Sequence, residues 1–359
     1  MRPTIKDVAR RAGVSIATVS RILAGSASAS RFTAATRDRV LQMSQEIGYT
    51  PDARASSLRS QRSRLIGVIA RDITQAFPAV LIAVLDTVLK EHGYELLLAQ
   101  GQTISGVDRF PEAFERHRIY GVIFVGTPHA TTDTAILHEY SRRLDQHVVG
   151  LTYSGTPRLP ISVQSDARLG VRLAVDHLVS LGHRRIAFAG AGVSGAMKQR
   201  LATFQEYTAS IPGLTSVVEE ADSSGARTGG ESMLRLLARD DPPTAVMFAN
   251  DEMAIGGLMA AYQSGRLVPR DLSIVGFDDI PLAGNCWPPL TTLRQPVRAM
   301  AERTVASLIG LMENGAKAAS ADNPEANLET NPEAHREFVF SPELVVRGST
   351  APPPVPGAR

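Results

Sequence analysis

The chain has 359 residues, of which 43% are apolar and 21% charged, and its net charge is +2. This length exceeds one ordinary hydrophobic core and predicts about two or three domains. The sequence contains no run of about 18 apolar residues that would indicate a membrane span, and the basic amino terminus does not resemble a secretory signal. The single cysteine, Cys286, cannot form an internal disulfide. We therefore expect a cytoplasmic protein.

Positive charge is concentrated in the first 64 residues, here called the basic head. It contains twelve Arg or Lys against four Asp or Glu, so it carries +8 and the remaining 295 residues carry −6. A basic head on a mildly acidic body predicts that the head alone binds a polyanion. A merely solvated basic surface is the alternative.

Residues 4–23 have the pattern of two short helices joined by a tight turn. Thr4 and Asp7 form a capping box, Gly13 ends the first helix, and Ser15 can cap a second one from Ile16 to Leu23. The outward positions of the second helix carry short side chains and one arginine, which suits a helix in the DNA major groove; an ordinary helical hairpin is the alternative. The predicted DNA contacts in this segment are Thr4, Ser15, Ile16, Ala17, Thr18, Ser20 and Arg21.

The stretch TIKDVARRAGVSIATVSRIL resembles the helix-turn-helix of the lactose-repressor (LacI/GalR) family of bacterial transcription regulators. The likeness continues through TRDRVLQMSQEIGYTPDARASSLRSQRSRLIGVI. It implies an all-α helix-turn-helix domain over residues 1–50, in which Ile16, Ala17 and Arg21 read bases. The loop 24–31 is about three residues longer than is usual in the family, which leaves its phosphate contacts open.

The same resemblance implies a hinge helix and linker over residues 51–63. Ala55 and Leu58 would contact the minor groove there, with Leu58 inserted as a wedge that kinks the operator.

From Arg64 onward, apolar strand-like runs alternate with helical stretches. This alternation predicts parallel sheets with helices on both faces, folded as two doubly wound lobes with a ligand site between them at the carboxyl ends of the strands. The seven predicted strands are 65–70, 94–99, 121–125, 148–151, 185–189, 244–248 and 272–276.

The body also resembles the family's effector-binding core, which has the periplasmic-binding-protein type I fold. Stretches that carry the likeness include GVRLAVDHLVSLGHRRIAFAG, PPTAVMFANDEMAIGGLMAAYQSGRLVPRDLSIVGFDDIPLA and SPELVVRGST. The resemblance implies a core over 64–350, with a first lobe at 64–160 plus 292–315 and a second lobe at 161–290 plus 336–348. The implied effector contacts are Phe77, Arg200, Asn250, Asp278 and Gln295, to which we add Lys198 beside Arg200. Simple helix capping is the alternative role for Asn250.

A sugar acid such as an aldonate is predicted as effector over a neutral sugar. Thr152 stands where the family often has an aspartate, and Lys198 adds positive charge beside Arg200. The GAMKQR loop and the pair Ser223-Ser224 have some likeness to gluconate-responsive members of the family.

Residues 190–195, GAGVSG, match the dinucleotide fingerprint G-x-G-x-x-G. They keep open an NAD(P)-binding redox regulator or dehydrogenase, although the polar Lys198-Gln199-Arg200 follows almost at once. No catalytic or metal-binding motif occurs, so we expect neither an enzyme nor a cofactor. Of Asp278 and Asp279, only one is expected to face the cleft, because adjacent side chains point apart. A solute-binding protein would share the body without the basic head.

Two further segments are expected to lack regular structure. Residues 314–335 read as a loose surface excursion and residues 351–359 as a disordered tail. The chain ends without the leucine-heptad helix through which some family members tetramerise, so we expect a dimer. The sequence thus predicts a dimeric regulator, most simply a repressor, whose affinity for a near-palindromic operator is controlled by a sugar or sugar acid.

Overall fold

The computed structural model divides the chain into two units, Met1–Ser63 and Arg64–Arg359. It describes residues 3–23, 32–49, 63–70, 72–100, 114, 116–119, 121–126, 147–152, 159, 161–191, 195–320 and 336–354. The predicted hinge contacts Ala55 and Leu58, and the long loop 24–31, lie outside these residues.

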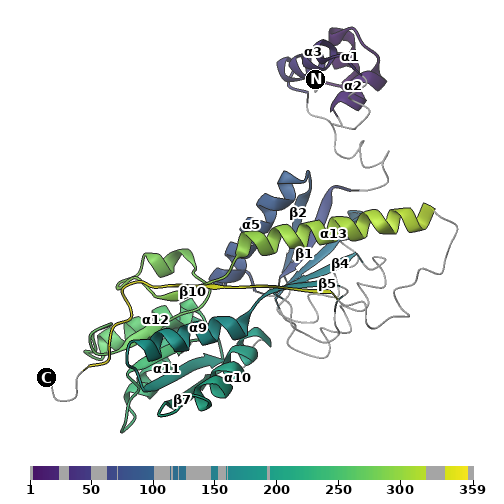
Figure 1. Cartoon of the computed structure of the whole chain (residues 1–359). Helices are drawn as coiled ribbons and strands as arrows, with labels where there is room; N and C mark the ends of the chain where they lie inside the picture. The colour runs from purple at the N-terminus through teal and green to yellow at the C-terminus, as the bar shows by residue number, and fades with distance from the viewer. Residues whose placement is uncertain are drawn as a thin grey trace. The chain divides into compact units, whose positions relative to one another are not determined.

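The first unit contains three helices, α1 (Ile5–Ala12), α2 (Ile16–Leu23) and α3 (Ala34–Glu46) (Figure 1). The predicted capping box is confirmed, because the backbone N–H and the hydroxyl of Thr4 both donate to Asp7 Oδ2, at 2.9 and 2.7 Å. Gly13 takes the left-handed conformation (φ 64°) that the tight turn requires. The core that joins the three helices consists of Val8, Ala9, Ala12, Val19, Ile22 and Val40.

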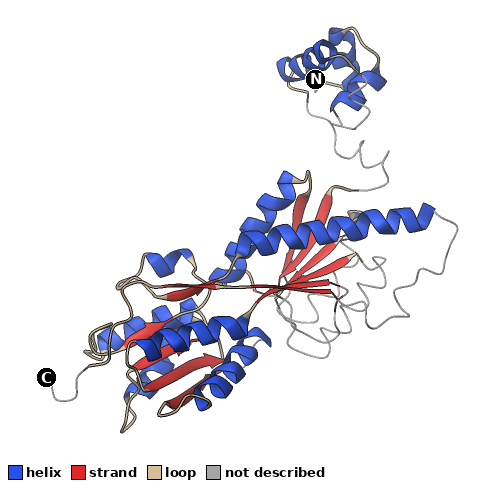
Figure 2. Cartoon of the chain, in the orientation of Figure 1, coloured by secondary structure: helices blue, strands red, loops and turns tan. Residues whose placement is uncertain are grey.

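The first lobe of the second unit is built on a six-stranded parallel sheet in the order β11-β5-β4-β3-β1-β2. Its strands are drawn in red in Figure 2. Its strands are β1 (Leu65–Ala70), β2 (Glu95–Gln100), β3 (Val122–Val125), β4 (Val148–Leu151), β5 (Ile161–Ser165) and β11 (Arg336–Phe340). Helices α5 (Ala76–Glu91) and α13 (Val297–Ser320) pack against each other and supply apolar side chains to the core on one face of the sheet.

The second lobe is built on a four-stranded parallel sheet in the order β7-β6-β8-β9. Its strands are β6 (Arg185–Ala191), β7 (Thr215–Ala221), β8 (Ala245–Phe248) and β9 (Ser273–Val275). Helices α9 (Ala167–Ser180) and α10 (Gly195–Ala209) pack together, as do α11 (Ala226–Leu237) and α12 (Asp251–Gln263) (Figure 1). The aromatic centre of this lobe is formed by Phe188, Phe204, Phe248 and Phe277, all with exposed fractions of 0%.

A short antiparallel ribbon of β10 (Thr292–Arg294) and β12 (Glu343–Val345) lies where the chain passes between the lobes. The chain makes this passage three times, after β5, after β10 and after β11. The sequence assigned residues 161–165 and 336–340 to the second lobe, but both strands belong to the first sheet, where they pair with each other. For β11 the reason is that a sheet can recruit a strand from far along the chain, which local periodicity does not reveal, while β5 (ISVQS) lacks a continuous apolar run that would have marked it as a strand.

Two segments expected to be irregular are partly ordered. Residues 314–320, the start of the predicted surface excursion, continue helix α13, in keeping with their alanine-rich sequence; residues 321–335 lie outside the described residues. At the predicted disordered tail, the Ala351 carbonyl accepts hydrogen bonds from Ser273 Oγ and from the buried ring of His183, each at 2.9 Å. These bonds fix the chain at Ala351, so the tail prediction was wrong for the described residues 351–354.

The close crossing of α11 and α12 gives the first testable prediction. A Cβ atom added at Gly256 would lie 1.7 Å from the Ala226 carbonyl oxygen, so Gly256→Ala must push the two helices apart. We expect the free energy of unfolding to fall by about 1–3 kcal/mol, measured by urea denaturation. The control is Gly310→Ala in α13, where nothing lies within 4 Å of the new Cβ. It should raise stability by about 0.5–1 kcal/mol. An unchanged urea midpoint for Gly256→Ala would contradict the tight crossing.

Candidate functional site

A cavity of about 490 Å³ lies in the core at the carboxyl ends of strands from both sheets. This is where ligands bind in open parallel sheets, as the sequence predicted. First-lobe strands contribute residues such as Asp72 after β1 and Thr152 after β4, while Asn250 and Asp278 follow β8 and β9 of the second lobe. The polar lining is made of Asp72, Thr74, Gln75, Thr152, Gln164, Ser165, Gln199, Arg200, Asp222, Ser223, Ser224, Asn250, Glu252, Asp278 and Gln295.

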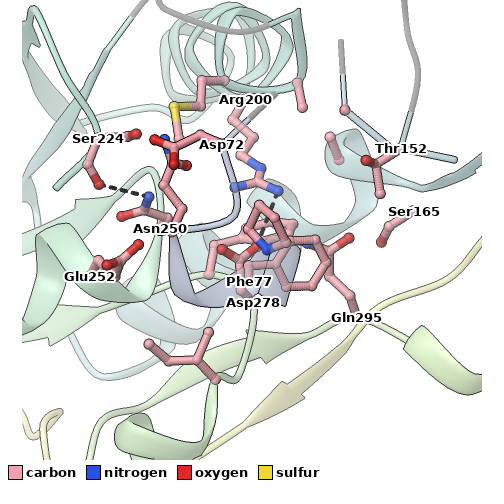
Figure 3. Close-up of a pocket in the computed structure, with 18 of the residues that line it drawn as sticks. Asp72, Phe77, Thr152, Ser165, Arg200, Ser224, Asn250, Glu252, Asp278 and Gln295 are labelled. Atoms are coloured by element: carbon pink, nitrogen blue, oxygen red, sulfur yellow. Dashed lines mark hydrogen bonds and ion pairs between the residues drawn. The ribbon is translucent and has the colours of Figure 1, made fainter. Parts of the chain in front are cut away.

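Five of the six residues predicted to bind an effector line this cavity: Phe77, Arg200, Asn250, Asp278 and Gln295 (Figure 3). Lys198 does not. It is exposed, because the helical period of α10 turns Met197 and Arg200 toward the buried side and Lys198 toward solvent. The positive charge that the sequence analysis placed beside Arg200 is therefore missing from the cavity wall. That the other five contact an effector remains a prediction.

Arg200 is the centre of the site, with an exposed fraction of only 6%. Its Nη1 donates to the Ala249 carbonyl at 2.5 Å, its Nη2 lies 3.4 Å from Asp278 Oδ1, and its guanidinium stacks 3.6 Å from the ring centroid of Phe277. The Nε–H is shielded from solvent and has no hydrogen-bond partner among the described residues. Buried donors are normally satisfied, so this N–H is an exception within the site, and the guanidinium as a whole still lines the cavity.

Asp278 completes a buried polar chain with Arg200 and Gln295. Its Oδ1 accepts a hydrogen bond from Gln295 Nε2 at 2.6 Å, and Figure 3 shows the three side chains converging. Burial raises the pKa of Asp278 to about 7, although Arg200 and Gln295 both favour the charged form. The site therefore holds a carboxyl group whose charge can change near neutral pH.

Asn250 uses both ends of its amide within the protein. Its Oδ1 accepts from the Met253 N–H at 2.8 Å at the start of α12, and its Nδ2 donates to the Ser224 carbonyl at 2.9 Å. Helix capping, the alternative role in the sequence analysis, is therefore present. Asn250 can still face an effector through the second lone pair of Oδ1.

The sequence analysis missed most of the carboxyl groups of the cavity. Its described lining carries Asp72, Asp222, Glu252 and Asp278 but only one cationic side chain, Arg200. Glu252 accepts a hydrogen bond from the backbone N–H of Ala76 at 3.2 Å, so it joins the second lobe to the first turn of α5, and burial raises its pKa. The sequence did contain a signal for two of them, because Asp72 and Glu252 lie two and four residues after the ends of the predicted strands 65–70 and 244–248.

The neighbouring Asp251 is structural. It is fully buried and accepts hydrogen bonds from Thr292 Oγ1 at 2.5 Å and from the Ile280 N–H at 2.9 Å. Burial raises its pKa to about 6. It ties α12 to the turn after β9 and to β10.

In the first unit, the side chains that the sequence analysis assigned to DNA lie on α2, at Ser15 just before it, and at Thr4 before α1. Ser15, Ile16, Ala17 and Arg21 are exposed, as is Thr4, while Thr18 and Ser20 are half-buried. Ser15 Oγ accepts from the Thr18 N–H at 3.1 Å and so caps the helix as predicted. The exposed face agrees with a recognition helix, and the individual contacts remain predictions.

The glycine motif lies in a strand–loop–helix context. Gly190 ends β6 with Ala191, and Gly195 begins α10; residues 192–194 lie outside the described part. The first two turns of α10 line the cavity with Ala196, Met197 and Arg200. The motif thus leads into the polar cleft rather than into a separate cofactor site.

A basic helix-turn-helix unit joined to a two-lobed core with a polar cleft defines a class of ligand-responsive DNA-binding proteins. Residues 4–52 match the family described as bacterial regulatory proteins, lacI family, and residues 175–350 match the periplasmic binding protein-like domain. The regulator MalR of Streptomyces coelicolor is 36% identical over 364 residues, covering 99% of this chain and 98% of the relative. The lactose operon repressor of Escherichia coli is 31% identical, covering 88% and 87%.

Solved structures give the same result. A lac repressor dimer bound to operator and the anti-inducer ONPF has a TM-score of 0.75 at 26% identity, covering 98% of this chain and 100% of the other. The regulator CelR in complex with cellobiose has a TM-score of 0.66 at 26% identity, covering 97% and 100%. The chain belongs to the LacI family of bacterial transcription regulators, as the resemblance implied. It is a regulator and not an enzyme, and no comparison supports the dinucleotide-binding alternative.

Proposed function

We propose that this regulator is a repressor whose affinity for its operator is controlled by a neutral sugar bound in the cavity between the lobes. The observation that carries the proposal is the cavity lining, in which the paired Arg200 and Asp278 lie among further carboxyl and amide groups. Carboxylates accept hydrogen bonds from hydroxyl groups, amides and the guanidinium donate to them, and the half-buried ring of Phe77 offers a face to a sugar ring. The similar structure of the regulator CelR in complex with cellobiose supports this ligand class.

The proposed effector is a neutral sugar and not the sugar acid that the sequence analysis favoured. That expectation depended on Lys198, which is exposed, and on the loss of one acid at Thr152. The described lining instead carries four carboxyl groups against one guanidinium, which disfavours an anion. The volume of about 490 Å³ lies within the range of about 300–1,000 Å³ typical of small-molecule pockets. A disaccharide is therefore a reasonable upper size for the effector.

The mechanism follows from the position of the cavity. A sugar that binds one angle between the lobes more tightly than another shifts the population of the core, and the operator affinity shifts by the same coupling. Ile16, Ala17 and Arg21 would read bases in the major groove of each half-site, with Ala55 and Leu58 in the minor groove. A DNA partner supports a location in the cytoplasm.

A homodimer is part of the proposal. Lac repressor dimers are among the structures similar to this chain, and a near-palindromic operator requires two copies related by a twofold axis. The second lobe exposes large apolar side chains that a second copy could cover, among them Met259 and Tyr262 on α12 and Trp287, with an exposed fraction of 90%.

A thermal-shift screen tests the effector class. The panel contains glucose, maltose, cellobiose, gluconate, hypoxanthine and NAD⁺. A ligand present at about 100 times its Kd should stabilise the protein by about 2.7 kcal/mol, a clear rise in Tm. We expect a neutral sugar to raise the Tm and gluconate to have a smaller effect. A rise with NAD⁺ alone would contradict the proposal and revive the dinucleotide reading of residues 190–195.

Arg21→Ala tests base reading by the recognition helix. If Arg21 donates to a guanine, the variant should lose about 1–3 kcal/mol of discrimination at one operator position, because a bidentate contact distinguishes the bases. The measurement is binding to an operator and to single-base variants selected from a random DNA library. The control is Arg10→Ala on α1, exposed by 78% of its side chain, which should weaken all sequences alike or not at all. Uniform loss with Arg21→Ala would mean that Arg21 binds only phosphate.

A further inference from the structure

The turn after β9 contains two successive residues in an unusual backbone conformation. Asp278 has φ 121° and Asp279 has φ 55°, and neither is glycine. Such a turn is unfavourable by itself and persists only where its surroundings hold it. Its effect is to direct the two carboxyl groups apart, as expected from the sequence. Asp278 lines the cavity, and Asp279 is bound elsewhere.

Asp279 is held by two arginines from distant parts of the chain. Its Oδ2 lies 2.6 Å from Arg294 Nε, and its Oδ1 lies 2.7 Å from Arg347 Nη2. The Asp279 side chain has an exposed fraction of only 8% and that of Arg347 21%, so this ion pair is largely shielded from solvent, whereas the Arg294 side chain is 48% exposed. Arg347 Nη1 also donates to the Leu290 carbonyl at 2.8 Å. We call Asp279, Arg294 and Arg347 the arginine clamp.

The clamp sits on the ribbon through which the chain leaves and enters the second lobe. Arg294 is the last residue of β10, and Arg347 follows β12 by two residues. After Arg294 the chain continues into α13, which packs on the first sheet, and β12 arrives directly from β11 of that sheet. Two of the three passages between the lobes are therefore tied to one carboxylate.

The cavity and the arginine clamp use neighbouring residues of the same two segments, 278–279 and 294–295. Asp278 accepts from Gln295 in the cavity, while Asp279 accepts from Arg294 in the ribbon, and the Asp278 N–H donates to the Leu293 carbonyl at 2.8 Å. A bound sugar that displaces the Asp278 backbone together with its carboxyl group would therefore also move the turn that holds β10. This is a continuous chain of bonded contacts from the ligand to the passages between the lobes.

We propose that the arginine clamp positions Asp278 for the effector and couples occupancy of the cavity to the passages between the lobes. The inference rests on the proposed function, because it assumes that the cavity binds the effector. Arg294 and Arg347 do not line the cavity, so they are positioning residues that act through Asp278 and Gln295.

Asp279→Asn removes the one negative charge of the arginine clamp. It adds little backbone strain, because asparagine tolerates the left-handed conformation. The first readout needs no ligand. Amide hydrogen exchange of residues 292–297 should become about tenfold faster in the variant, as expected for losing charge-assisted hydrogen bonds. Arg347→Gln breaks the same clamp and should act alike. The matched control is Asp241→Asn, which breaks the exposed Arg185–Asp241 pair of the same lobe and should leave this segment unchanged.

The second readout is calorimetric binding of maltose and of cellobiose. The Kd of whichever sugar binds the wild type should rise about tenfold in Asp279→Asn and in Arg294→Gln, and not in Asp241→Asn. Unchanged exchange at 292–297 would overturn the inference, as would equal acceleration throughout the second lobe, which would indicate a purely structural role. If neither sugar binds the wild type, the proposed ligand class fails, while the exchange experiment still decides whether the clamp holds the turn and the ribbon.

Discussion

Arg200→Met should abolish sugar binding while leaving a folded protein that still binds its operator. The variant loses the unpartnered Nε–H, the hydrogen bond to Ala249 and the stacking on Phe277 at once. Removing one partner of a buried ion pair costs about 3–5 kcal/mol when the remaining charge stays buried. Asp278 can lessen the cost to the fold by taking up a proton, because its pKa is already raised to about 7. It cannot replace the donor that the ligand loses.

We therefore expect the Kd of the sugar to rise by at least about 100-fold, which corresponds to about 2.7 kcal/mol. Calorimetry measures this loss, and gel-shift titration shows whether the operator complex still forms and has stopped responding to the sugar. Lys198→Met is the matched control, because Lys198 lies on the same helix but is exposed. It should bind the sugar like the wild type. A normal Kd in Arg200→Met, or a loss in Lys198→Met, would mean that the effector lies elsewhere.

Some elements of the fold could be predicted from the sequence and others could not. The strands of the two sheets were predictable where they are buried on both faces, because such strands read as continuous apolar runs; the runs at β3 and β4, for example, are fully buried. Strand β5, with two of five residues polar at its end, and β11, at the edge of the sheet, lack this signal. The ribbon strands β10 and β12 have three residues each, too few for a period to show.

The site was predictable residue by residue only where a motif gave the position. Arg200, Asn250, Asp278 and Gln295 were found in this way, whereas Lys198 was added for its proximity in sequence and faces solvent. On a helix, adjacent residues point about 100° apart, so sequence proximity does not place two side chains in one cavity.

The partners of Asp279 illustrate the second limit. The sequence indicated that Asp278 and Asp279 would point apart, and the structure confirms that Asp278 lines the cavity. It could not indicate that Arg294 and Arg347 would meet Asp279, because the contacts depend on the antiparallel pairing of two short strands. The same holds for the acidic character of the cavity, since its four carboxyl groups come from both lobes.

That acidic character leads to a prediction about pH. The affinity for a neutral sugar should rise as the pH is raised through about 7, because only the charged form of Asp278 can use both oxygens as acceptors and keep its ion pair with Arg200. If the charged form alone binds, the Kd increases about tenfold for each pH unit below the pKa. The affinity for gluconate should change in the opposite direction, because a charged Asp278 repels it.

Raising the pH changes the folding contribution of Asp278 in the opposite direction to its effect on sugar affinity. The pKa of Asp278 is raised above its unfolded value of 3.8, so its contribution to the free energy of unfolding is fully present below about pH 4 and is lost as the pH rises through about 7. Asp251 acts in the same direction with a pKa of about 6. The half-buried His177 and the buried His183 act oppositely, since burial lowers their pKa values and their contribution is lost as the pH falls below about 6.5. The pH dependence of the free energy of unfolding therefore cannot be assigned to Asp278 alone.

The variant Asp278→Asn isolates the titration of Asp278, because it shares every other titrating group with the wild type. Calorimetric titrations of the sugar between pH 5.5 and 8.5, at about half-unit steps across the expected pKa of about 7, should show a steep dependence for the wild type and a flat, weaker affinity for the variant. An asparagine keeps one acceptor oxygen and can hydrogen-bond Gln295, so the fold of the site is preserved. Equal pH dependence in the two proteins would assign the titration to another carboxyl group, for which Glu252 is the first candidate, because burial also raises its pKa and it joins the two lobes at Ala76. The same titration with Glu252→Gln then separates the two carboxyl groups, since only the group that faces the sugar can change its affinity with pH.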